Sequence, residues 1–152
     1  MKVQNKIKTS LPIDIAKKVV LNVLFTQNIV SDRLSEILKP FDLSNEQFNV
    51  LRILRGQKGN PANMSLILER MVAKTSNTTR LVDKLLLKKF VTRDVCSSNR
   101  RKIEVQITAD GLEILEVLDP LIVEHEQQFA RNLTTDELLT FNILLEKYRN
   151  IE

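Results

Sequence analysis

The stretch Lys74–Ile107, KTSNTTRLVDKLLLKKFVTRDVCSSNRRKIEVQI, decides the fold of this chain. Its first part has the apolar spacing of a short helix that carries small polar residues and cations on the opposite side. Its second part contains two β-type runs, residues 90–95 and 103–107, which are joined by a turn cluster at residues 97–99. The stretch therefore predicts a helix followed by a β-hairpin.

Positive charge is concentrated in and just before this stretch. Residues 70–102 contain ten Lys and Arg but only Asp83 and Asp94, which gives a net charge of +8, whereas residues 103–152 carry −8 and the whole chain +4. A basic block in an otherwise balanced or acidic chain is typical of a polyanion-binding surface. The alternative is a solvated cationic face without a partner, and the local structure favours the first interpretation.

A second short helix upstream completes a helix-turn-helix pattern. Residues 65–71 predict a short helix, residues 72–74 a tight turn, and a second helix begins near residue 75 or 76 and ends near residue 88. At 100° per residue, this second helix has one apolar side with Leu81, Val82, Leu85 and Leu86 and an opposite side with Ser76, Arg80, Asp83, Lys84 and Leu87, with Asn77 beside them. Short polar side chains allow a helix to enter the major groove and bond base edges, and cations reach guanines or phosphates. The pattern therefore predicts a DNA-reading helix.

The chain before this motif predicts two helices. The first is capped by Ser10, has Pro12 in its first turn, and ends near residue 38, before Pro40. Residues 44–47 have the S-x-x-Q spacing of a capping box, which opens a second helix that ends near residue 56. Residues 61–64 are expected to form an extended connector.

The chain after the hairpin predicts two more helices. Thr108 is the expected cap of a long helix that extends to about residue 132, and Pro120 is expected to kink or divide it. Residues 134–137, TTDE, are expected to cap the last helix. The first and last helices both carry more apolar residues than one small domain needs, so we expect the two ends of the chain to pack against a second copy.

Composition argues against several other functions. The chain has 152 residues, of which 43% are hydrophobic and 28% charged, as is ordinary for one globular domain. One Cys and one His exclude an intramolecular disulfide and a typical zinc site, and no glycine-rich phosphate loop or recognisably spaced nucleophile is present. We therefore expect no catalysis, metal or cofactor, and no apolar run reaches the length of a membrane span. A cytoplasmic, nucleoid-associated protein is expected, with Cys96 a half-buried strand residue and His125 a surface or interface residue.

Taken together, these motifs resemble the multiple antibiotic resistance regulator (MarR) family. The resemblance covers roughly residues 12–150, and its most specific parts are LSNEQFNVLRIL at 43–54, residues 69–93 and NRRKIEVQITADG at 99–111. It implies a homodimeric bacterial transcription regulator, mainly α with a small β-wing. In such a protein, residues 1–152 form a single MarR-like domain, in which about 43–108 form the winged helix-turn-helix lobe and about 12–40 and 110–150 form the dimerisation helices.

The resemblance also implies a set of DNA-binding residues. These are Ser76, Asn77, Thr79, Arg80 and Lys84 on the groove-reading helix and Arg101 at the wing tip, where the sequence also has Arg100 and Lys102. The wing commonly has Asp two residues before its arginine, and this chain has Asn99, which supplies no charge. Lys74 replaces a frequent Ser in the turn, and the first helix lacks the cysteine of peroxide-sensing members.

The expected partners are double-stranded DNA, at a pseudo-palindromic operator, and a small aromatic or acidic effector. The candidate effector pocket consists of Phe25, Ile29, Phe48 and Leu51, with Arg52 or Arg55 as the cation for an anion. For each of the apolar residues the alternative is that it completes the core. Two other functions remain open, namely a winged helix used for protein–protein docking and a sequence-neutral architectural DNA binder.

Overall fold

The computed structural model describes residues 13–72, 77–95 and 103–150 of the chain. Its elements are the α-helices α2 (Ile15–Leu38), α3 (Asn45–Arg55), α4 (Met64–Arg70), α5 (Thr78–Leu87), α6 (Ala109–Ala130) and α7 (Thr135–Arg149), the 3-10 helix η1 (Lys39–Phe41), and the strands β1 (Ala62–Asn63), β2 (Val91–Val95) and β3 (Ile103–Ile107). The predicted class, mainly α with a small β-wing, is confirmed.

Helix α2 begins later than the sequence predicts. The side chain of Asp14 accepts a hydrogen bond of 2.8 Å from the amide of Ala16, so Asp14 is the cap. The predicted cap, Ser10, and Pro12 lie outside the described residues. The end of α2 is as predicted, because Pro40 falls in the first turn of η1 and the chain then reverses at Asp42, whose φ is 53°.

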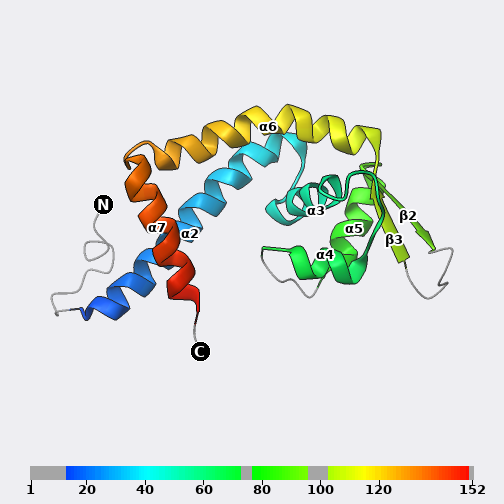
Figure 1. Cartoon of the computed structure of the whole chain (residues 1–152). Coiled ribbons are helices and arrows are strands. Elements are labelled where there is room, and N and C mark those ends of the chain that lie inside the picture. Colours follow the sequence, from blue (N-terminus) through cyan, green and yellow to red (C-terminus); the bar gives the residue numbers. More distant parts are fainter. Residues whose placement is uncertain (1–12, 73–76, 96–102, 151–152) are drawn as a thin grey trace.

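Helices α3, α4 and α5 and the sheet gather into one lobe, from which β2 and β3 extend (Figure 1). The predicted capping box opens α3, because the Ser44 hydroxyl accepts from the amide of Gln47 at 3.2 Å and the Ser44 amide donates to the Gln47 side chain at 2.9 Å. Leu51 and Leu54 of α3 and Leu85 of α5 are fully buried in the core. Burial of each such side chain contributes about 1.5–3 kcal/mol, so a single chain provides this lobe with its own core.

The sheet has one strand more than the predicted hairpin. Its order is β1-β3-β2, and both pairings are antiparallel, with Ala62 opposite Val105 and Arg93 also opposite Val105. The connector expected at residues 61–64 contains β1, whose two residues are too short a run to show alternation in the sequence. The hairpin strands themselves are as predicted.

Helix α6 leads from the lobe to the other end of the molecule. Thr108 caps it as predicted, accepting from the amide of Gly111 at 3.1 Å. A Cβ at residue 111 would overlap the carbonyl oxygen of Phe90, so glycine allows α6 to start directly against the hairpin. Pro120 does not divide α6, which is one helix that ends at Ala130, two residues before the predicted end.

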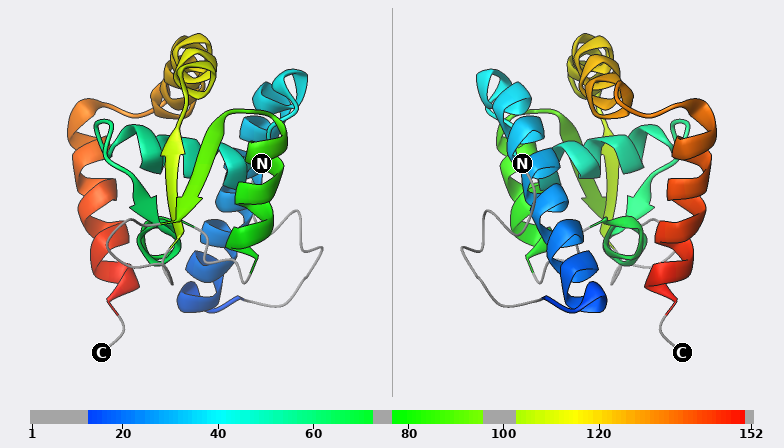
Figure 2. Two further views of the ribbon diagram at one scale, coloured as in Figure 1. Left: turned by 90° about the vertical axis from the view of Figure 1, so that its right-hand side faces the viewer. Right: turned by 90° about the vertical axis from the view of Figure 1, so that its left-hand side faces the viewer.

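The apolar residues at the two ends of the chain do not cover each other. Figure 2 shows α2 and α7 on opposite sides, and no residue of α7 is buried. Exposed apolar side chains are Ile15, Val19, Val20, Leu24 and Ile29 on α2 and Leu139, Phe141, Ile143, Leu144 and Tyr148 on α7. The helical end of the chain therefore lacks a covering layer, unlike the lobe.

His125 is buried within the single chain, which corrects its prediction as a surface or interface residue. Only 6% of it is exposed, and its ring packs edge-on against Phe129, with 5.1 Å between ring centroids. The guanidinium carbon of Arg33 lies 5.7 Å from the centre of the Phe129 ring. The contact between Arg33 and Phe129 joins α2 to α6. The sequence around His125, which is acidic, gave no sign of its burial.

Candidate DNA-binding surface

Helix α5 presents a polar, cationic side opposite its buried side. Val82 and Leu85 are buried in the core, whereas Thr79, Arg80 and Lys84 are exposed. The predicted separation of faces is therefore present. Asn77 is exposed at the N-cap position, so it precedes the helix instead of lying on its face, and Ser76 lies outside the described residues.

The hairpin begins directly after α5 and is linked to it by an ion pair. Nη1 of Arg93 on β2 lies 2.7 Å from Oδ1 of Asp83 on α5. Only Val91 of β2 is buried, and its other four residues are exposed. The tip cations Arg100, Arg101 and Lys102, and also Asn99, Lys74 and Cys96, lie outside the described residues.

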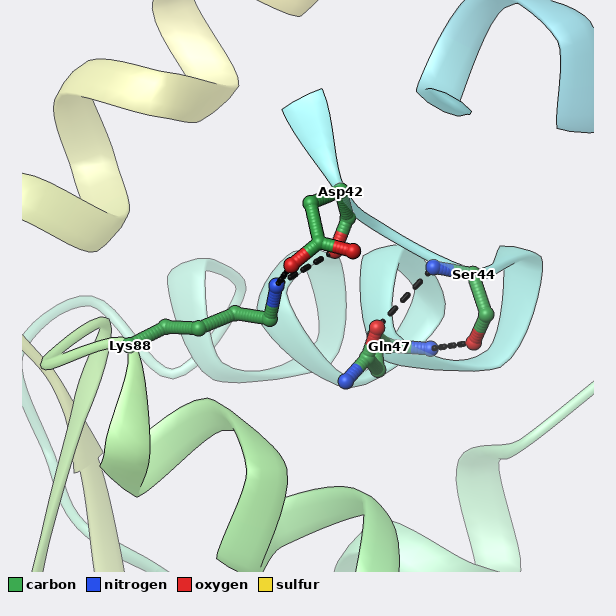
Figure 3. A network of polar contacts seen from close by, with 4 residues as sticks. All are labelled: Asp42, Ser44, Gln47 and Lys88. Atoms are coloured by element: carbon green, nitrogen blue, oxygen red, sulfur yellow. Dashed lines mark hydrogen bonds and ion pairs between the residues drawn. The ribbon is translucent and has the colours of Figure 1, made fainter. Parts of the chain in front are cut away.

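The C-terminal end of α5 is fastened to the start of α3 (Figure 3). The ammonium of Lys88 donates to the carbonyl oxygen of Asp42 at 2.6 Å and also pairs with its carboxylate. The hydrogen bond from Lys88 lowers the pKa of Asp42, and the attraction between the two charges adds to the effect. The capping box of Ser44 and Gln47 lies beside this contact, so α5 and α3 are held at their neighbouring ends.

A bidentate ion pair joins the lobe to α6. Nη1 and Nη2 of Arg55 lie 2.7 and 2.9 Å from the two carboxylate oxygens of Asp119. Hydrogen bonding from Arg55 lowers the pKa of Asp119. The two parallel bonds restrict the direction of approach as well as the distance, so this pair orients α3 relative to α6.

The candidate effector residues divide between core and surface. Phe48 and Leu51 are buried in the core, Phe25 is partly buried, and Ile29 is 45% exposed. Arg55 is paired with Asp119, whereas Arg52 is exposed, with its guanidinium carbon 5.7 Å from the centre of the Phe48 ring. Within one chain, none of the six lines the open cleft of about 540 Å³ formed by Ser31, Ser35, Lys39, Asp42, Leu43, Ser44, Asn45, Glu46, Gln47 and Lys84.

Two ion pairs between separate elements were not predicted from the sequence. The pairs Asp83–Arg93 and Arg55–Asp119 join residues that are 10 and 64 positions apart. Asp83 was assigned to the polar face of its helix, but no spacing rule connects it to a strand residue. The only available signal was that Asp83 is one of two acids in the basic block.

The described residues set limits on other kinds of site. They contain no group of three or more His, Cys, Asp or Glu arranged to hold a metal ion. None of the described helices has both the length and the apolar character that crossing a membrane requires.

Comparison with known proteins gives consistent matches. The profile of the MarR family matches residues 43–103. The multiple antibiotic resistance protein MarR of Escherichia coli is 32% identical over 123 residues, which cover 79% of this chain and 83% of that protein. Residues 43–103 contain α3, α4, α5, β2 and the first residue of β3.

Solved structures show the same arrangement. A cysteine-to-serine mutant of MarR from Escherichia coli, complexed with operator DNA, aligns with a TM-score of 0.76 and 28% identity over 90% of this chain and 99% of that one. BpsR of Bordetella bronchiseptica, whose DNA binding is regulated by 6-hydroxynicotinic acid, aligns with a TM-score of 0.81 and 19% identity over 93% of this chain and 100% of that one. At that identity the second likeness concerns the fold alone.

Proposed function

The chain belongs to the MarR family of transcription regulators, and we propose that it acts as a homodimer on a pseudo-palindromic site in double-stranded DNA. The observation that carries this proposal is the exposed face of α5. Thr79, Arg80 and Lys84 project from it, while Val82 and Leu85 on the other side anchor the helix in the core. A rigid helix with short polar and long cationic side chains suits the major groove.

The exposed apolar residues at both ends support the dimer. Phe141, Ile143 and Leu144 of α7 remain 48–62% exposed in the single chain. A two-fold partner would cover them and would present two copies of α5 to the same face of a duplex. A stable interface of this kind buries about 1,600 Å² or more.

The proposal also includes the other DNA-binding residues that the sequence predicts. Ser76 and Asn77 precede α5 or lie at its start and would contact base edges or phosphates beside the groove. Arg100, Arg101 and Lys102 lie in the segment between β2 and β3, and Arg101 is suited to a minor groove, because narrow A·T stretches concentrate negative potential. The proposal includes no catalytic step, metal or cofactor, and it places the protein with the DNA in the cytoplasm. It also treats residues 1–152 as a single domain, with the lobe at about 43–108.

The test is a genomic footprint followed by titration of the footprinted duplex and a random duplex. We expect the operator to bind at least about 10³-fold more tightly than random DNA. If the dimer neutralises roughly 6–10 phosphates, its affinity will fall by about 10³–10⁵ between 50 and 200 mM salt. Equal affinities would identify an architectural DNA binder, and no binding at low salt would favour protein–protein docking.

We also propose that a small aromatic or acidic ligand weakens DNA binding. The six candidate residues remain the proposed region, and Arg52 is the better cation, because Asp119 already occupies the guanidinium of Arg55. A ligand bound between the lobe and the helical base, which consists of α2, α6 and α7, would change DNA affinity only if it binds the two arrangements of the lobes unequally. The coupling should be about 5–150-fold, and it should be reciprocal.

Calorimetry with a panel of aromatic acids tests this second proposal. The expected result is weaker ligand binding to the DNA-bound dimer than to the free dimer, with a loss of affinity in the Arg52→Gln variant. If the acids bind neither form, or bind both forms equally, the chain is not a ligand-responsive switch of this kind.

A further inference from the structure

Two elements of the proposed DNA surface, the helix α5 and the wing strand β2, are connected by Asp83 and Arg93. The distance of 2.7 Å between Nη1 and Oδ1 is that of a charge-assisted hydrogen bond. The side chains are 48% and 32% exposed, so the pair lies at the surface and not in the core. Asp83 is three residues after Arg80 and directly before Lys84, which places its carboxylate among the cations proposed to meet DNA.

The charge of Asp83 is unfavourable for attraction to DNA. A carboxylate on this surface repels phosphates, and Arg93 cancels its charge instead of adding to the positive field. The pair as a whole therefore contributes almost nothing to the sequence-independent attraction. A surface that served attraction alone would gain from a neutral residue at position 83.

Apolar packing anchors the hairpin through Val91 of β2 and Val105 of β3, and the ion pair adds a direct link from α5 to the exposed part of β2. Beyond Val91, every residue of β2 is exposed. Among the described residues, the Asp83–Arg93 bond is the hydrogen bond that connects side chains of α5 and β2. Without it, the outer part of β2 would lose this link and would be held to the lobe through its pairing with β3.

We propose that Asp83 and Arg93 are positioning residues for specific DNA binding, which hold the wing at a set angle to the recognition helix. This inference rests on the proposed function. A specific site requires α5 and the wing to engage neighbouring grooves simultaneously, so an angle fixed in advance avoids an ordering cost upon binding. Binding to random DNA does not require this fixed angle, because phosphate contacts tolerate many orientations.

The test is a double-mutant cycle with Asp83→Asn, Arg93→Gln and the double variant, each titrated with the footprinted operator and a random duplex. On random DNA the single variants should differ in sign, since Asp83→Asn removes a negative charge and tightens binding, whereas Arg93→Gln removes a positive charge and weakens it. The ratio of operator to random affinity should fall in both, by about two- to fivefold for each half-site. The double variant should show no further fall in this ratio.

Asp42→Asn is the matched control. It breaks the Asp42–Lys88 ion pair, which also involves the end of α5 but does not involve the wing. Asn tolerates the left-handed conformation of residue 42, so the backbone should be preserved. The control should leave the ratio of operator to random affinity unchanged.

A merely structural role for Asp83 and Arg93 predicts a different outcome. Partial unfolding lowers the affinities for operator and random DNA by the same factor, so the ratio stays constant. An unchanged ratio in both single variants, or independent and additive losses in the double variant, would overturn the positioning role. If the unmodified protein itself shows no preference for the operator, the proposed function fails, and that result is recorded before any variant is compared.

Discussion

The lobe and the helical base of this protein differ in how much of their apolar surface a single chain buries. In the lobe, Leu51, Leu54 and Leu85 are fully buried by residues of the same chain. In the base, no residue of α7 is buried, and Ile143 is 62% exposed. The described part of the lobe therefore has its own core within one chain, whereas the base exposes an apolar face that, in our proposal, a second chain covers.

The largest expected effect comes from a substitution that disrupts the proposed dimer interface on α7. Ile143→Asp puts a charge on the proposed interface twice, because a two-fold dimer repeats every contact. Each interface hot spot is worth about 2 kcal/mol or more, so the dimer should dissociate at micromolar concentration and operator affinity should fall by more than about 100-fold. Sedimentation and DNA titration check this prediction, with Asp136→Asn as a conservative polar control on the same helix. A dimer that survives Ile143→Asp would place the interface elsewhere.

Truncation of a leucine to alanine should affect stability differently in the lobe and in the base. Leu51→Ala in the lobe should lower the free energy of unfolding by about 2–5 kcal/mol, because it leaves a cavity in a closed core. Leu144→Ala, at a residue that is 56% exposed in one chain, should lower stability by an amount that depends on protein concentration. Denaturation at several concentrations distinguishes the two. A concentration-independent loss at Leu144 would mean that its covering comes from its own chain.

The specificity of the lobe depends on a different kind of residue. Arg80→Ala should cost about 1–3 kcal/mol and relax the preference at one base position if Arg80 reads a guanine. Arg101→Ala should weaken binding most at operators with A·T flanks. Titration of operator variants measures both effects. A uniform loss across all sequences for Arg80→Ala would make it a phosphate contact, and unchanged binding for Arg101→Ala would remove the wing from the interface.

The smallest expected effect is a pH dependence of the cap of α7. The capping boxes of α3 and α7 differ in one side chain, an amide in α3 and a carboxylate in α7. Gln47 completes the box in the lobe and Glu137 completes the one in the base, where the Thr134 amide donates to the Glu137 carboxylate at 2.8 Å. That hydrogen bond lowers the pKa of Glu137 below its ordinary value of 4.5. The cap of α7 therefore contributes its full stability above pH 4.5 and loses it as the pH falls through the lowered pKa, whereas the cap of α3 does not titrate.

Sedimentation of the protein and of Glu137→Gln between pH 6 and roughly pH 3 tests this difference. The unmodified dimer should weaken slightly relative to the variant as the medium becomes acidic. The prediction is contradicted if both dimers show the same dependence on pH.

Local rules predicted much of this molecule from sequence. The caps at Ser44, Thr108 and Thr134 and the two hairpin strands depend on residues within a few positions of one another, and the structure confirms them. The predicted cap of α2, Ser10, was wrong, because the helix is capped by Asp14, which lies farther along the chain. Several polar residues near the N-terminus satisfy the same local rule, so the rule does not choose among them.

The remaining features depend on partners distant in the chain. Strand β1 is identified only by its pairing with β3, and the contact of Arg33 with the Phe129 ring depends on α2 packing against α6. The ion pairs of Arg55 with Asp119 and of Asp83 with Arg93 form only when separate elements meet. Periodicity shows which face of a helix is polar, but it does not identify the residue of another element that contacts this face.

If a shared base holds the two lobes at a fixed spacing, the spacing of the operator half-sites determines the affinity of the dimer. Half-sites about one helical turn apart lie on the same face of the duplex. Insertion of roughly five base pairs, half a turn, places them on opposite faces. We expect this insertion to lower the affinity of the dimer to that of a single half-site duplex. Equal affinity for the original and the expanded operator would contradict it.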